Sequence, residues 1–146
     1  MIKKEQDYNM LDWWKKVMID NYATFSGRAR RSEYWYFMLF HIIIMFGLWM
    51  GFFVVLGMES EIMSGLVAVL LLLYIAGSIL PSLAVTARRL HDVNKSGWMY
   101  LVCLIPFGSL VLLYYMVLDG DRGRNDYGED PKMPVGRSSI SQIGME

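Results

Sequence analysis

The chain has 146 residues, enough for one domain, and its 14 basic and 14 acidic residues give a formal net charge of zero. That balance gives no reason to expect nucleic acid as a partner. Hydrophobic residues make up 55% of the chain and the mean hydropathy is +0.32, both high for a soluble domain. With Cys103 as its only cysteine, the chain offers neither an intrachain disulfide nor a cysteine-based metal site.

The first predicted element is an amphipathic helix over residues 8–25. Apolar side chains recur there at helical spacing, and polar side chains occupy the other side. The apolar positions are Met10, Leu11, Trp14, Val17, Met18, Tyr22 and Phe25. Such a helix suits the plane of a membrane interface, and it equally suits the end of a helical bundle on which it docks. Both alternatives bury the same face.

Three apolar runs without Asp, Glu, Lys or Arg follow, at residues 34–57, 62–85 and 98–118. A helix needs roughly 20 apolar residues to cross the ~30 Å hydrocarbon core of a bilayer, and each run is that long. We therefore expect an all-α integral membrane protein with three apolar helices. Residues 1–131 would form a single membrane domain, and residues 132–146 a mobile tail.

The third run contains an interruption, Pro106-Phe107-Gly108-Ser109. Proline removes a helical hydrogen bond and clashes with the preceding turn, so the run is either a kinked span or a re-entrant hairpin. The two alternatives put the C-terminal tail on opposite sides of the membrane. The length of the run favours the span, because each half of a hairpin would have only about ten residues.

Basic residues predict the orientation of the chain, because Lys and Arg beside a span are retained in the cytoplasm. The loop at residues 58–61 has two glutamates and no basic residue, whereas the loop at residues 86–97 has three basic residues. Seven more precede the first run: Lys3, Lys4, Lys15, Lys16, Arg28, Arg30 and Arg31. We expect the N-terminus in the cytoplasm. A hairpin at Pro106 would place all 14 basic residues there.

Polar residues gather where the first run begins and the second ends. Arg88, Arg89, His91 and Asp92 close the second run, and Glu33 opens the first. The simplest interpretation of the basic residues is a topology anchor with one local ion pair to Asp92. The alternative is a polar site at the inner interface that binds a lipid headgroup or a partner. Because the two runs are antiparallel, we expect Glu33 to pair with Arg88 or Arg89.

No catalytic motif is recognisable, and we expect the protein not to be an enzyme and to hold no cofactor or metal ion. The acidic spacing from Asp119 to Asp130 resembles the ligand positions of an EF-hand loop. However, Arg124 stands where that loop requires glycine, and no helices of EF-hand type flank it.

Three blocks of the sequence together resemble the domain-of-unknown-function family 805, a group of small bacterial inner-membrane proteins. The blocks are "FSGRARRSEYW" at 25–35, "ARRLHDVNKSGW" at 87–98 and "GRNDYGEDP" at 123–131, in the family's order. By resemblance, the matching positions are Gly27, Arg28, Arg31, Glu33 and Trp35, then Arg88, Arg89, His91, Asp92, Gly97 and Trp98, then Asn125, Gly128, Asp130 and Pro131. The resemblance implies location and fold but no biochemical activity.

For function, we expect a multi-pass inner-membrane protein that binds lipid or a partner protein through a basic cytoplasmic face. The lipids would include those with anionic headgroups, and the protein partner would be a second copy or another membrane protein. The residues expected at this face are Arg28, Arg31, Glu33, Trp35, Arg88, Arg89, His91 and Asp92, with Asn125, Gly128, Asp130 and Pro131 as a structural tail motif. The alternative is a subunit of an oligomeric transporter or channel.

Overall fold

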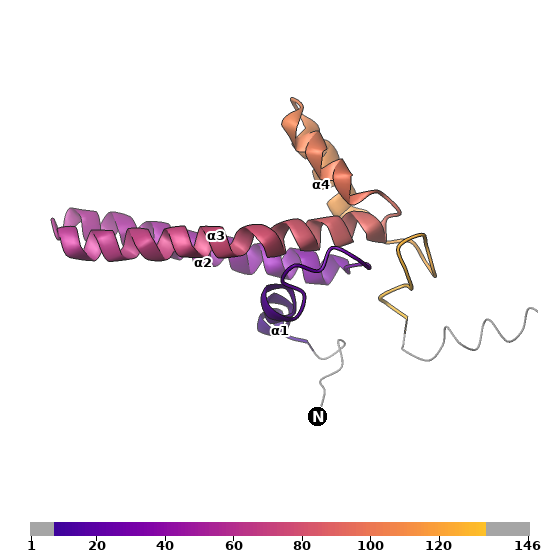
Figure 1. The fold of residues 1–146 in the computed structure, drawn as a ribbon, viewed down its shortest axis with the longest axis horizontal. Coiled ribbons are helices and arrows are strands. Elements are labelled where there is room, and N and C mark those ends of the chain that lie inside the picture. The colour runs from indigo at the N-terminus through magenta and orange to yellow at the C-terminus, as the bar shows by residue number, and fades with distance from the viewer. Residues whose placement is uncertain (1–7, 134–146) are drawn as a thin grey trace, which may run out of the picture.

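The computed structural model describes residues 8–133, all of whose regular elements are helical (Figure 1). The α-helices are α1 (Met10–Lys15), α2 (Arg31–Gly57), α3 (Glu61–Asp92) and α4 (Gly108–Val117). A π-helical turn, Lys16–Asp20, continues α1, and a 3-10 helix, Gly97–Leu104, precedes α4. The all-α prediction is confirmed for these residues. Most of the predicted mobile tail, from residue 134 onward, lies outside the described residues.

Helices α2 and α3 form a long antiparallel hairpin and lie side by side along its length (Figure 1). With 27 and 32 residues, both are long and apolar enough to cross a membrane. None of the most apolar 18-residue stretch of α2 is buried, and only 11% of that of α3 is. A core helix of a soluble protein would be mostly buried, so this exposure favours the membrane interpretation of the first two runs.

The hydrophobic core lies at one end of the hairpin, where α2 begins and α3 ends. Its fully or nearly fully buried members come from every part of the chain that meets there: Val17, Ala29, Tyr34, Phe37, Val85, Leu90 and Met116. Beyond this end, large apolar side chains such as Phe46 on α2 and Leu72 on α3 are exposed. Two helices bury little of their surface against each other, so the rest of the hairpin needs lipid or protein around it.

The predicted helix over residues 8–25 is shorter in the structure, and its range was wrong at the C-terminal end. A capping box between Asn9 and Asp12 begins α1, as expected for a helix start. The π-helical turn then ends at Asp20, which leaves Tyr22 and Phe25 in a loop. Helix α1 docks on α2, with the Trp14 and Phe40 rings 6.1 Å apart. This contact is the one expected of a docked helix, and the placement of α1 in a membrane interface stays a prediction.

The third apolar run is a helical hairpin, so the favoured prediction of a kinked span was wrong. The 3-10 helix leads away from α3, and α4 leads back to it, because Arg89 on α3 donates hydrogen bonds to the carbonyls of Met116 and Leu118 (Figure 1). The turn between them depends on local chemistry. Phe107 has φ +64°, and a Cβ on Gly108 would lie 1.7 Å from the Val102 carbonyl oxygen. Only glycine permits so close an approach.

Candidate functional site

The three sequence blocks meet at the end of the α2–α3 hairpin that holds the core. We call this region the junction and define it as residues 27–35, 87–98 and 119–131. The amide of Ala29 bonds to the carbonyl of Arg88, and the amide of Asp121 bonds to the carbonyl of Asp92, both across long sequence separations. The junction therefore joins the start of α2, the end of α3 and the tail in one structure.

Glu33 is the first of two buried carboxylates in the junction. It lies in the first turn of α2, where the helix dipole favours a negative charge, and it is fully buried. Its Oε1 lies 2.5 Å from Nη1 of Arg88, and its Oε2 lies 2.8 Å from Nζ of Lys16. The predicted pairing of Glu33 with a second-helix arginine is confirmed. The Nε and Nη2 groups of Arg88 have no hydrogen-bond partner among the described residues.

Asp92, at the end of α3, is the second buried carboxylate. Arg28 approaches its Oδ1 with Nε at 2.9 Å, and Arg89 approaches its Oδ2 with Nη1 at 2.5 Å. The sequence predicted one local ion pair to Asp92, and Arg89 forms it at i,i+3 spacing. All three side chains are almost completely buried, and a buried charge is tolerated only where it is paired and hydrogen-bonded.

Three of the junction arginines, Arg28, Arg30 and Arg89, also donate to backbone carbonyls. Arg28 donates to the carbonyls of Asp121 and Gly123, the latter at 2.6 Å. Arg30 donates to the carbonyl of Pro131. Together with the Arg89 bonds to the end of α4, these contacts fix the tail onto α3 and the residues before α2. A guanidinium group has five N–H donors in a rigid fork, so one arginine can bind a carboxylate and several carbonyl oxygens at once.

The tail motif forms a tight loop against α3. Asn125 donates from Nδ2 to the carbonyl of His91 at 2.8 Å, and its backbone bridges to Gly128. Asp130 accepts a hydrogen bond from the amide of Gly123 through Oδ2. Gly120 lies so close to Asp92 that a Cβ there would be 2.0 Å from Oδ2. Each of these residues therefore has a structural contact within the junction.

His91 makes contacts within the junction, and Trp35 connects it to α4. His91 Nδ1 lies 3.1 Å from the carbonyl oxygen of Gly27, and its ring stacks on that of Tyr127 with centroids 3.9 Å apart. Trp35 donates from Nε1 to the carbonyl of Met116, which ties α2 to the end of α4. Both side chains are partly exposed.

Arg31 lies at the surface instead. Its Nη1 is 3.2 Å from Oδ1 of Asp119, and Nζ of Lys132 is 3.2 Å from the same oxygen. Hydrogen bonds from Arg31 and Lys132 hold the pKa of the Asp119 carboxyl below its usual value. Exposed pairs of this kind contribute little to stability.

The sequence identified neither Gly120 and Asp121 as junction residues nor Lys16 as a partner of Glu33. Lys16 belongs to the polar side of a helix whose docking position was left open. Gly120 and Asp121 follow the third apolar run, and their place near Asp92 depends on the hairpin that the sequence did not favour. Two adjacent glycine-containing pairs, Asp119-Gly120 and Arg122-Gly123, were the available signal for a close backbone approach.

These features define a small α-helical membrane protein with two helices of membrane-crossing length and a cross-linked ionic junction at one end. The chain belongs to the family described as protein of unknown function (DUF805), whose model matches residues 22–129. That range includes nearly all of the junction.

Two relatives from Escherichia coli (strain K12) are similar over most of their length. Inner membrane protein YhaI is 41% identical over 121 residues, which cover 82% of this chain and 95% of that protein. Inner membrane protein YhaH is 40% identical over 128 residues, which cover 84% of this chain and 98% of that protein. No solved structure matches the chain. By kinship with these relatives, the chain is an inner membrane protein of unknown function.

Proposed function

We infer that this chain is a non-catalytic, lipid-binding protein of the inner membrane. Helices α2 and α3 cross the bilayer, with the junction in the cytoplasm and the turn at residues 58–60 outside. The hairpin made by the 3-10 helix and α4 lies in the cytoplasmic leaflet. The junction holds the hairpin at that depth, and the apolar surface of the hairpin contacts lipid.

The observation that carries this proposal is the exposure of the short hairpin formed by the 3-10 helix and α4. Its side chains include no Asp, Glu, Lys or Arg, and those at its far end are almost fully exposed: Leu104 is 82% and Phe107 is 81% exposed. Such an apolar surface is unfavourable in water and favourable in hydrocarbon. Both ends of the hairpin return to the same end of α3, which supports insertion into one leaflet without crossing.

The distribution of positive charge supports the cytoplasmic placement of the junction. Every basic residue of the described chain lies in or beside the junction, and none lies in the turn between α2 and α3. Arg28, Arg88 and Arg89 are buried in ion pairs, so headgroups would meet the more exposed basic residues around them, such as Arg31 and Lys95. We therefore favour lipid contact through the hairpin over headgroup capture by the buried arginines.

A transporter or channel subunit is the less supported alternative. Two crossing helices enclose no pathway by themselves, and a polar route would have to be built between copies. Within the two long helices the ring hydrogen bond between His41 Nδ1 and Tyr74 Oη, at 3.1 Å, joins two polar side chains across the pair. That contact satisfies both groups within one chain, which accounts for them without a transport role.

The proposal is tested by the depth of the hairpin in a bilayer. A fluorophore is attached at Leu104→Cys in a Cys103→Ser background, and the full chain is reconstituted in phospholipid vesicles. We expect quenching by lipids that carry a quencher on the acyl chain and protection from aqueous iodide. The same label at Asp126→Cys, in the exposed tail loop, is the matched control and should show the opposite pattern. Iodide quenching at Leu104 equal to that at Asp126 would refute the proposal.

A further inference from the structure

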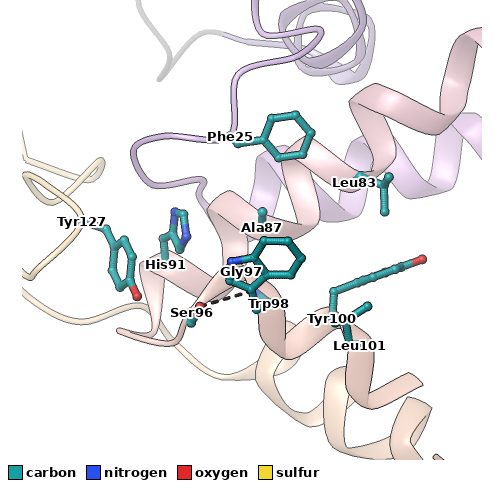
Figure 2. Close-up of a pocket in the computed structure, with 10 residues that line it drawn as sticks. All are labelled: Phe25, Leu83, Ala87, His91, Ser96, Gly97, Trp98, Tyr100, Leu101 and Tyr127. Carbon is teal, nitrogen blue, oxygen red and sulfur yellow. Dashed lines mark hydrogen bonds between the residues drawn. The ribbon is translucent and has the colours of Figure 1, made fainter. Parts of the chain in front are cut away.

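A cleft of about 690 Å³ lies beside the junction, between α3, the 3-10 helix and two loops (Figure 2). Its size is in the range of small-molecule sites in proteins. Phe25 comes from the loop before α2, and Tyr127 from the tail loop. The Glu33 and Asp92 ion pairs do not line it. None of the described residues that line the cleft is Asp, Glu, Lys or Arg.

The cleft has a polar end and an apolar end. Figure 2 shows His91 and Tyr127 face to face at one end, Leu83, Tyr100 and Leu101 toward the other, and Trp98 between them. Leu83 follows Ile79 and Leu80 at i+4 and i+3, so the three share one face of α3. Ile79 and Leu80 are exposed, and the apolar end therefore continues onto the part of α3 that faces lipid.

At the polar end, the protonation of His91 can be assigned from its neighbours. The carbonyl oxygen of Gly27 can only accept a hydrogen bond, so His91 Nδ1, 3.1 Å away, carries a proton. In the neutral ring, Nε2 is then an acceptor. Nε2 lies beside Gly97, 3.3 Å from where a Cβ on that glycine would be, and both residues line the cleft. The site at this end therefore offers a hydrogen-bond acceptor, and a ligand group that donates a hydrogen bond would fit it.

Aromatic rings line the same cleft. Phe25, Trp98 and Tyr127 all line the cleft, and Tyr127 stacks on the His91 ring. The face of an aromatic ring attracts a cation, most strongly in tryptophan. A headgroup of net negative charge would find no Lys or Arg in the lining to balance it, whereas an ammonium would find an acceptor nitrogen and ring faces. A quaternary ammonium would find the rings but could not donate to Nε2.

We propose that this cleft holds one phosphatidylethanolamine molecule from the cytoplasmic leaflet, whose ammonium donates a hydrogen bond to His91 Nε2 among the three aromatic rings. An acyl chain lies along Leu83 and Leu101 and continues over the exposed face of α3. The site rests on the proposed function, because lipid reaches the cleft only if the hairpin lies in that leaflet.

The test is a lipid titration of the delipidated full chain in detergent micelles, read by native mass spectrometry. Phosphatidylethanolamine, phosphatidylcholine and phosphatidylglycerol with identical acyl chains are compared. We expect phosphatidylethanolamine to bind about 10-fold more tightly than either of the others, since one charge-assisted hydrogen bond is added to the ring contacts. Equal binding of all three lipids, or preference for phosphatidylglycerol, would overturn the amine site.

Two variants probe the two halves of the recognition. His91→Asn keeps a donor for the Gly27 carbonyl and removes the Nε2 acceptor. Trp98→Leu removes a ring from a side chain that is 80% exposed, so the fold should tolerate it. Each should weaken phosphatidylethanolamine binding about 5- to 10-fold. Tyr114→Leu, an exposed aromatic of α4 outside the cleft lining, is the matched control and should bind as the parent does.

The outcomes separate this site from the proposed function. If the Leu104 label is in lipid while Trp98→Leu binds phosphatidylethanolamine as tightly as the parent, the site is wrong and the membrane hairpin stands. If that label is in water, the proposed function is wrong, and with it the route by which lipid would enter the cleft.

Discussion

Glu33 and Arg88, 55 positions apart, form a buried ion pair at 2.5 Å that joins the first turn of α2 to the last turns of α3. Lys16 contacts the other carboxylate oxygen of Glu33, so one side chain links the N-terminal helical segment to both long helices. This pairing was expected from the antiparallel order of the two runs, and the structure selects Arg88 over Arg89.

The pair predicts a specific pattern of coupled destabilisation. Glu33→Gln leaves Arg88 buried and unpaired, and should cost about 3–5 kcal/mol in the free energy of unfolding. Arg88→Gln should cost less, because Glu33 keeps Lys16. The double variant should cost less than the sum of the single changes, whereas Glu33→Gln with Arg89→Gln should be additive within about 0.5 kcal/mol. Denaturant unfolding in detergent micelles measures the three single variants, Arg89→Gln included, and the two double variants. Strict additivity for Glu33 with Arg88 would show that the pair contributes no coupling.

Asp92 and Asp119 offer a matched comparison of a buried and an exposed carboxylate, each between two basic side chains. Asp92→Asn should destabilise the protein by about 3–5 kcal/mol, since it leaves Arg28 and Arg89 without a buried counter-charge. Asp119→Asn should have little effect at neutral pH because solvent screens its contacts. Similar losses from the two variants would contradict the assignment of the junction as the buried ionic centre.

The lowered pKa of Asp119 also fixes the sign of its small pH effect. A carboxyl whose pKa is lower in the folded state stabilises that state above its unfolded pKa, and the contribution is lost as pH falls through the folded pKa. The parent and Asp119→Asn should therefore converge in stability under acid. A carboxyl titration followed by NMR should place Asp119 below the ordinary range of about 3.9. An ordinary or raised value would show that Arg31 and Lys132 do not pair with it in solution.

Gly120→Ala should displace the tail from α3. The added methyl group would lie 2.0 Å from Oδ2 of Asp92, a carboxylate held by two arginines. We expect trypsin to cleave after Arg122 and Arg124 at least about 10-fold faster in this variant, because cleavage follows the population of the open tail. Gly51→Ala, where a Cβ meets nothing within 4 Å, is the control and should be cleaved at the parent rate.

Gly108→Ala tests the turn of the hairpin in the same way. A Cβ there would overlap the backbone carbonyl of Val102, which cannot move aside as a flexible side chain can. We expect a loss of more than about 2 kcal/mol in unfolding free energy, of the order seen when backbone geometry is made incompatible. Gly65→Ala, with open space at its Cβ, should be neutral or slightly stabilising. Equal stability of the two variants would mean that the turn is not closed as described.

The parts of this fold that the sequence predicted depend on composition and on short distances along the chain. The long apolar runs at residues 34–57 and 62–85 predicted α2 and α3, and the turn between them predicted the depth at which Glu33 meets Arg88. The third run was harder, since its length satisfied the requirement for a span. The run forms a hairpin because Gly108 can approach the Val102 carbonyl closely, and a hydropathy profile does not contain that information.

The tail contacts could not be predicted because they follow from that hairpin. Only once α4 returns to α3 can Arg28 reach the carbonyl of Gly123 and Asn125 reach that of His91. The resemblance identified the residues of the tail motif but not their hydrogen-bond partners. Likewise, Lys16 could be assigned to Glu33 only after α1 was seen to dock on α2.

The central claim is that the short hairpin formed by the 3-10 helix and α4 returns the tail to the side of the membrane that holds the junction. Cysteine labelling at Asp126→Cys, in a Cys103→Ser background, measures this most directly. Ser60→Cys, in the turn before α3, and Ser96→Cys, before the 3-10 helix, serve as outside and inside references. With an impermeant maleimide on intact spheroplasts, we predict labelling at position 60 and none at positions 96 and 126 until the membrane is disrupted. Labelling at position 126 in intact spheroplasts, with position 96 protected, would contradict the hairpin and restore a third crossing.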